Sequence, residues 1–190
     1  MTMRFAPAVL FCLFAAGCGA EFKEFSPDGK FKVLMPGTPE EKSQAVMGMT
    51  VKAWGVSQKN GAYAVSVADM PALALVAGAD TVLEGVVPGV MQGSQAKLTS
   101  QSKVTLGGKY PGRAFEADVP SKNGVLKGRA YLVNGRLYQM LAIGEKSWIN
   151  SGDVTKFLDS LQLIGEPDAP TAKDAPTAKD APAKDGPTKK

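Results

Sequence analysis

The chain has 190 residues, with 22 basic and 18 acidic side chains, 44% apolar residues, two cysteines and no histidine. The absence of histidine excludes Ser-His-Asp and Cys-His catalytic triads and any metal site that uses imidazole ligands. Lysines and arginines are scattered singly among acids and form no basic stripe, so we expect no nucleic-acid partner.

The N-terminus is typical of a secretory signal. Arg4 supplies a positive charge, and an apolar run interrupted by Pro7 follows over residues 5–16. This run is too short to span a bilayer comfortably and has the layout of a removable export signal. It ends in the sequence Leu13-Phe14-Ala15-Ala16-Gly17-Cys18.

Small residues immediately before a cysteine resemble the lipobox of bacterial lipoproteins. The resemblance implies that residues 1–17 are a cleaved signal peptide and that the sulfur of Cys18 receives a diacylglycerol. One position departs from the family, since Ala15 stands where leucine is usual. The alternatives are an ordinary cleaved signal or an uncleaved anchor, in which Cys18 is incidental.

The lipobox resemblance predicts an exported protein that is held at a membrane by the lipid on Cys18. Each buried methylene of the lipid contributes about 0.8 kcal/mol to membrane binding. Residues 18–24 are then a lipidated tether, and Gly19 favours the outer membrane or the periplasmic face under the family's sorting rule. No cysteine follows Cys18 in the sequence, so the mature chain has no internal disulfide and no cysteine metal site.

The first half of the domain reads as strands followed by a helix. Residues 31–35 alternate in polarity, residues 45–57 form a second strand, and Asn60-Gly61 predicts a hairpin into a third strand over 63–69. The next stretch, residues 72–95, carries an apolar helical stripe. The stripe comprises Leu83, Val86, Val87, Val90 and Met91.

Charges near the middle of residues 72–95 favour a soluble helix packed on a sheet over a membrane span. These charges are Asp80 and Glu84. Pro88 lies inside the stripe and predicts a kink or a break, because its ring clashes with the carbonyl of Glu84.

The second half of the domain reads as more strands and a closing helix. Strands are predicted over 103–106, 115–119, 125–133 and 136–143, the last two joined by a type I′ turn at Asn134-Gly135. An amphipathic pattern predicts a helix over 148–161, with Ser151 as its cap. Hairpins in place of crossovers indicate an α+β fold, with an antiparallel β-sheet and flanking helices in a single domain.

Three phrases in this order resemble PsbP-like and DcrB-like domains. They are Phe25-Ser-Pro-Asp-Gly-Lys-Phe-Lys-Val-Leu-Met-Pro-Gly-Thr-Pro39, the hairpin over 128–143, and Phe157-Leu-Asp-Ser-Leu-Gln-Leu163. The resemblance implies a PsbP-like α/β sandwich over residues 25–164. Members of the family share no catalytic residue, so it implies no catalytic, cofactor-binding or metal-binding residue here.

Carboxylates are the strongest candidates for chemistry. Glu116 and Asp118 lie two apart on a predicted strand and share a face, where they could bind a cation or act as acid and base. Asp69 ends another strand. The alternative is an ordinary solvent-facing surface with cross-strand ion pairs, and Asp28 is explained by its Ser-Pro-Asp-Gly turn. Glycines at 85, 89, 93, 107 and 108 form no phosphate-binding loop.

Six aromatic residues could form either a recognition surface or part of the core, and strand positions favour the core. They are Trp54, Tyr63, Tyr110, Tyr131, Tyr138 and Trp148. Residues 165–190 contain the repeat Asp-Ala-Pro-Thr-Ala-Lys. This tail has too few apolar residues to fold, so we predict a disordered spacer or brush that could also contact a cell-wall polymer or a protein.

The sequence therefore predicts a non-catalytic, lipid-anchored cell-envelope protein that acts as a binding or assembly module and uses no cofactor. Its expected partners are the membrane, through Cys18, and an unidentified envelope protein or cell-wall polymer. The alternatives are a carboxylate-dependent hydrolase that uses Glu116, Asp118 or Asp69, and a small-ligand carrier, which needs a sizeable apolar cavity.

Overall fold

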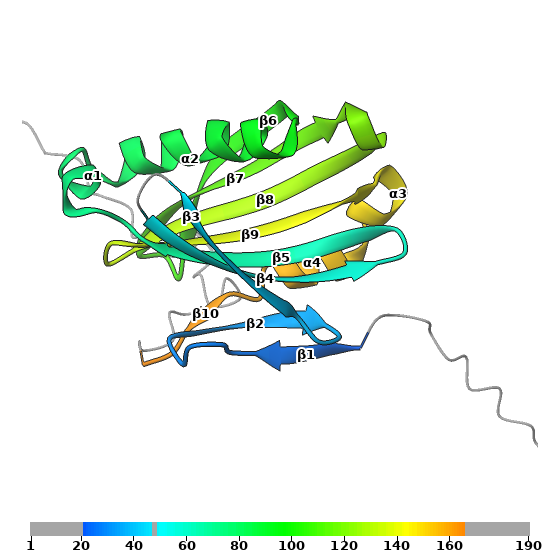
Figure 1. The fold of residues 1–190 in the computed structure, drawn as a ribbon, viewed down its shortest axis with the longest axis horizontal. Coiled ribbons are helices and arrows are strands. Elements are labelled where there is room, and N and C mark those ends of the chain that lie inside the picture. The colour runs from blue at the N-terminus through cyan, green and yellow to red at the C-terminus, as the bar shows by residue number, and fades with distance from the viewer. Residues whose placement is uncertain (1–20, 47–48, 166–190) are drawn as a thin grey trace, which may run out of the picture.

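The computed structural model describes residues 21–46 and 49–165, which form an α+β structure (Figure 1). Its elements are β1 (Phe22–Phe25), β2 (Phe31–Pro36), β3 (Glu40–Val46), β4 (Met49–Gln58), β5 (Gly61–Asp69), α1 (Ala72–Val76), α2 (Ala79–Ser94), β6 (Lys97–Leu106), β7 (Tyr110–Val119), a 3₁₀ turn (Pro120–Lys122), β8 (Gly124–Val133), β9 (Arg136–Glu145), α3 (Lys146–Ile149), α4 (Gly152–Leu158) and β10 (Gln162–Leu163).

The strands form two antiparallel sheets. The large sheet has seven strands in the order β3-β4-β5-β9-β8-β7-β6, and the small sheet has three in the order β1-β2-β10. Figure 1 shows the small sheet on one side of the large sheet and α2 on the opposite side. The predicted α+β class with antiparallel pairing and flanking helices is confirmed.

The core between the two sheets forms because each strand alternates in polarity. From the small sheet, Phe31, Val33 and Met35 are almost completely buried. They meet large side chains of the large sheet, and α3 and α4 close the same core. Tyr63 packs edge-on against Phe157 of α4, with ring centroids 5.0 Å apart.

A second core lies on the other face of the large sheet, under α2. Val82, Leu83 and Val87 are the buried residues of this helix, and they pack on β7 and β8. Pro88 was predicted to cause a kink or a break, and the break does not occur, because α2 contains Pro88 and continues to Ser94. The single helix predicted over residues 72–95 is divided in two, because α1 ends at Val76 and α2 begins at Ala79. None of the helices in the described ranges is long and apolar enough to cross a membrane.

Two other predicted elements are also divided in the structure. The single strand expected over 45–57 is wrong, because β3 and β4 form a hairpin and pair from Glu40↔Gly55 to Val46↔Met49. The closing helix expected over 148–161 is divided into α3 and α4. Ser151 is the N-cap residue of α4, but its side chain makes no capping hydrogen bond.

The folded domain begins before the predicted boundary at residue 25. Phe22 starts β1, pairs with Pro36 of β2, and packs edge-on against Tyr63 at 5.9 Å between ring centroids. Residues 22–24 therefore belong to the domain and are not part of a tether, as had been expected for 18–24. The predicted signal, Cys18 and residues 166–190 of the tail lie outside the described residues.

Candidate functional site

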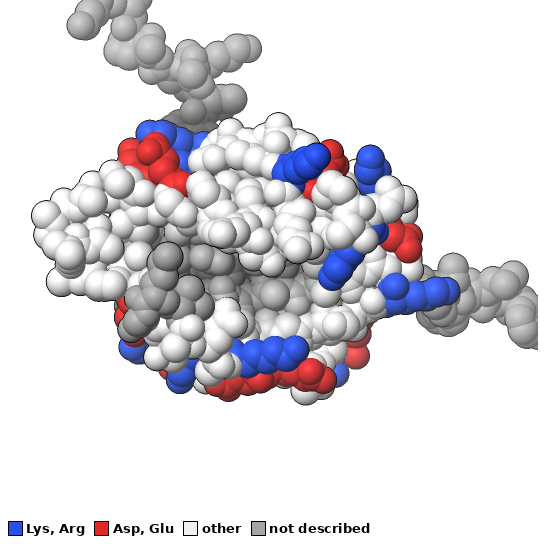
Figure 2. All heavy atoms as spheres, turned by 45° about the horizontal axis from the view of Figure 1, so that its top comes forward, with Lys and Arg blue, Asp and Glu red and all other residues white. Residues whose placement is uncertain are grey.

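A groove lies beside α2, where the helix leaves part of the large sheet uncovered. Helix α2 packs over β7 and β8 and its cluster includes Leu137 of β9, whereas no described residue of β3, β4 or β5 belongs to that cluster. The groove has a volume of about 570 Å³. Figure 2 shows this face hollowed, with uncharged residues around most of the rim.

Strand β5 contributes small side chains to the floor of the groove, beside the larger Val51 of β4 and Leu137 of β9. Strand β5 presents Ser66 and Ala68 to the groove, while its opposite face carries Tyr63 and Val65, which are buried between the sheets. Side chains alternate across a strand, so one strand can have a large face and a small face. Cross-strand pairing aligns Ala68 with Val51 of β4.

The wall formed by α2 also uses small residues. Gly85 and Gly89 lie one helical turn apart and line the groove beside Val86 and Val90. A Cβ atom added at either glycine would meet no atom within 4 Å. The space beside the helix is therefore open, and glycine is not required there by close packing.

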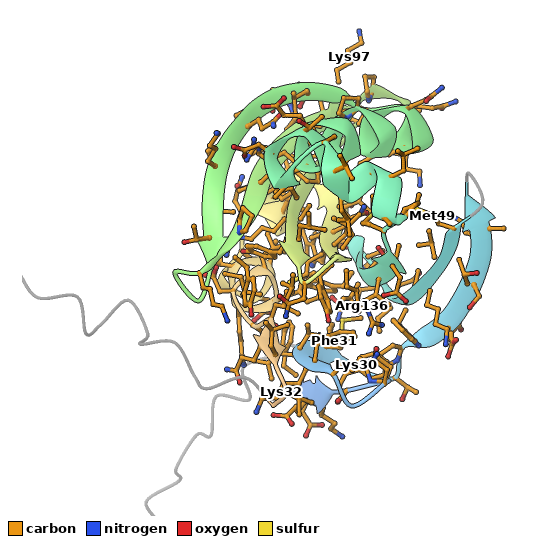
Figure 3. The ribbon with its side chains drawn as sticks, turned by 90° about the vertical axis from the view of Figure 1, so that its left-hand side faces the viewer. Lys30, Phe31, Lys32, Met49, Lys97 and Arg136 are labelled. Atoms are coloured by element: carbon orange, nitrogen blue, oxygen red, sulfur yellow. The ribbon has the colours of Figure 1, made fainter. Side chains whose placement is uncertain are left out.

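The groove is lined mainly by aliphatic residues. Four uncharged polar side chains also reach it, those of Gln44, Ser66, Thr81 and Gln139. Of the described residues that line the groove, none is acidic or basic. Met49 of β4 lies on the hairpin across from the helices in Figure 3. A site of this kind holds apolar groups and offers a few hydrogen bonds.

Helix α1 places exposed apolar side chains beside the groove. Ala74 and Ala77 line the groove, while Leu73 and Val76 are 85% and 84% exposed. Exposed apolar residues that adjoin an apolar hollow are typical of a binding surface. The groove and α1 together form the candidate functional site.

An ion-pair cluster holds α2 on the sheet and so fixes the wall of the groove. Arg113 of β7 is 3% exposed, and its guanidinium donates to Asp80 at 2.8 Å and to Glu84 at 3.4 Å. Lys103 of β6 also donates to Asp80, at 3.1 Å. The hydrogen bonds from Arg113 and Lys103 lower the pKa of the Asp80 carboxyl from its ordinary value.

Glu116 and Asp118 share a face of β7, as predicted, but they do not converge with Asp69 or with the groove. Glu116 pairs with Lys127 of β8 at 3.6 Å and Asp118 is exposed, both on the face of β7 turned away from α2. Asp69 ends β5 and pairs with Arg136 at 3.7 Å.

The distance between these acids follows from the strand register. Asp118 is aligned, through β8, with Gly144 of β9, whereas Asp69 is aligned with Arg136. These two positions of β9 are roughly 27 Å apart at the usual rise of a strand. None of the three acids lines the groove. Within the described ranges, no group of three or more acidic, cysteine or histidine residues could hold a metal ion.

The other predicted candidates have structural roles. Asp28 accepts a hydrogen bond from the backbone of Lys30 at 3.0 Å, as expected for a turn, and also pairs with Arg136 at 2.5 Å. Five of the six aromatic residues are buried, so the core prediction is confirmed for them; they are Trp54, Tyr63, Tyr110, Tyr131 and Tyr138. Trp148 is half-buried and packs on Tyr63.

The fold is similar to that of a solved cyanobacterial protein. Cyanobacterial PsbP (CyanoP) from Synechocystis sp. PCC 6803 superposes with a TM-score of 0.52 and 14% sequence identity, over 77% of this chain and 95% of that one. The protein PA94 of unknown function from Pseudomonas aeruginosa gives a TM-score of 0.40 at 6% identity, over 70% and 90% of the two chains. No family model and no curated protein matches the sequence. The chain therefore has a PsbP-like α+β fold.

Proposed function

We propose that this chain is a non-catalytic, lipid-anchored cell-envelope protein that acts as a binding module through the groove beside α2. The observation that carries the proposal is the groove itself, which is apolar, open and about 570 Å³ in volume. That volume lies within the range of about 300–1,000 Å³ found for ligand sites. Its uncharged lining suits binding better than acid–base chemistry.

The lipid anchor is supported by the sequence. The lipobox-like residues before Cys18 and the resemblance to DcrB-like envelope lipoproteins both favour export and attachment to a membrane. The domain begins at Phe22, so an anchor on Cys18 holds it within roughly 14 Å of the lipidated residue.

The proposed anchor and the groove are arranged so that both can be occupied together. Strand β1 belongs to the small sheet, and α2 lies on the opposite face of the large sheet (Figure 1). The tether before β1 therefore does not cover the groove, which stays open to a partner or to lipid. A small-ligand carrier is a second candidate function, which the apolar volume of the groove also supports.

Position-specific photo-crosslinking in the native envelope tests the proposal. A photoreactive amino acid replaces Thr81 of α2 or Gln44 of β3, which line the groove, and a control replaces Gly93 of α2, which does not. We expect adducts from Thr81 and Gln44 and few from Gly93. A Cys18→Ala chain should lose the adducts if the anchor delivers the protein to its partner. Equal adducts from all three positions would refute the groove as the binding surface.

A further inference from the structure

Apolar exposure in this protein is concentrated beside the groove. Helix α1 contributes three of the large hydrophobic residues that are exposed in the described ranges, with Leu73 and Val76 above 80% and Leu75 at 36%. The neighbouring Ala74 and Ala77 line the groove, so the exposed side chains continue its apolar surface. Exposed residues of this type on a short helix are suited to contact with lipid.

We infer that the groove holds one acyl chain of a membrane phospholipid, with α1 as an apolar lip beside the place where the chain enters. This inference rests on the proposed function, because it requires the groove to be the binding surface. The head group stays outside, in water, since no charged side chain of the described residues lines the groove.

The lining favours an acyl chain over an extended peptide. An added peptide strand needs free backbone donors and acceptors from a sheet edge. The floor, however, is made mainly by β4, β5 and β9, each of which is already paired on both sides. Among the described residues of the edge strand β3, Gln44 alone lines the groove, so that edge offers a peptide little of its backbone there. The polar groups within reach are the amides of Gln44 and Gln139 and the hydroxyls of Ser66 and Thr81. These groups suit the uncharged ester that joins an acyl chain to its head group.

The volume of the groove also matches one acyl chain. A water molecule occupies about 30 Å³ of liquid and a methylene group is of similar size, so a chain of about 16 carbons needs roughly 500 Å³. The groove provides about 570 Å³. A single turn of α-helix, about 10 Å across and 5.4 Å long, fills roughly 400 Å³. The groove therefore has room for little more than one turn of a helical peptide, but for the whole of one acyl chain.

The glycines of α2 supply variants that fill the groove without disturbing the fold. Gly85→Leu and Gly89→Leu place side chains where an added Cβ meets no atom within 4 Å. Gly93→Leu is the matched control, because Gly93 has the same open surroundings but does not line the groove. Leucine favours a helix more than glycine does, so all three variants are expected to keep or raise the melting temperature.

The test uses the full lipidated chain in vesicles of phosphatidylethanolamine and phosphatidylglycerol. A small fraction of the phospholipid carries a photoreactive diazirine within one acyl chain, and adducts are mapped by mass spectrometry. We expect adducts on α2 and β4 or β5. In Gly85→Leu and Gly89→Leu their yield should fall at least about tenfold, as expected when the burial of about two methylenes is lost. Gly93→Leu should match the unchanged protein.

The lip is tested by Leu73→Ser and Val76→Ser, which are exposed positions and leave the core intact. We expect adducts to form severalfold more slowly at the same groove positions, whereas an unchanged rate would overturn the role of α1.

Lipid adducts that do not decrease in the leucine variants, or that map mainly to the small sheet, would overturn the acyl-chain inference. If the photoreactive residues at Thr81 and Gln44 capture a protein while the lipid probe gives no groove adduct, the inference fails but the proposed binding function stands. If neither experiment yields groove adducts, both fail.

Discussion

Replacing Gly85 and Gly89 by alanine should stabilise the protein. Both residues lie in the interior of α2, and a Cβ atom added at either would meet nothing within 4 Å. Glycine in a helix interior is less favourable than alanine by about 0.8–1.0 kcal/mol. The double variant should therefore be more stable by about 2 kcal/mol, which raises the melting temperature of a chain of this size by roughly 4–8 °C.

Thermal unfolding followed by circular dichroism measures this effect, and two further glycines act as controls. Gly93→Ala should also stabilise the protein, because its surroundings are equally open. Gly128→Ala should destabilise it, because the new Cβ would overlap the ring of Phe115. A double variant at Gly85 and Gly89 with a lower melting temperature than the unchanged protein would refute the reasoning, since it would mean that the groove beside α2 is not open.

The hydroxyl of Tyr63 is buried without a hydrogen-bond partner, and burial raises its pKa to about 12 from the ordinary 10. As the pH rises, the unfolded chain loses this proton before the folded protein does. The contribution of Tyr63 to the free energy of unfolding is therefore complete below pH 10 and declines by about 2–3 kcal/mol as the pH rises to 12. Denaturant unfolding of Tyr63→Phe should show a smaller decline over this pH range, and a decline equal to that of the unchanged protein would contradict the argument. Arg113→Leu removes the main cause of the lowered pKa of Asp80, so NMR titration should show that pKa rising; an unchanged value would refute the ion-pair cluster. Phe157 is fully buried between the sheets, so Phe157→Ala should lower the free energy of unfolding, measured with denaturant, by about 3–5 kcal/mol. A decrease below about 1 kcal/mol would contradict the packing of Phe157 in this core.

Much of the fold was predictable because strand alternation and turn chemistry are local signals. Asn134-Gly135 joins β8 and β9 as expected, with both residues in the left-handed region at φ 48° and 81°. The pairing of β3 with β4 was missed because residues 45–57 contain no asparagine, aspartate or proline to signal a division into two strands. The early start of the domain at Phe22 depends on its contact with Tyr63, which is distant in sequence.

The groove was not predicted, although a signal for it exists in the sequence. In β5, small residues at 62, 64, 66 and 68 alternate with Tyr63, Val65 and Val67, which indicates one shallow face and one bulky face. The glycines of α2 do not form a phosphate-binding loop, but their spacing also indicates a helix surface without side chains, and this second signal was missed. The ion-pair cluster was missed because the position of Arg113 under α2 depends on how the helix crosses the sheet.

The central claim is that the groove beside α2 is the binding surface, and methionine NMR tests it most directly. Met49 and Met70 line the groove, whereas Met35 and Met140 are fully buried in the other core. In the full chain labelled with ¹³C-methyl methionine, solubilised envelope components should shift the signals of Met49 and Met70 and leave those of Met35 and Met140 unchanged. Unchanged signals from Met49 and Met70, or equal shifts of all four methionines, would contradict the account.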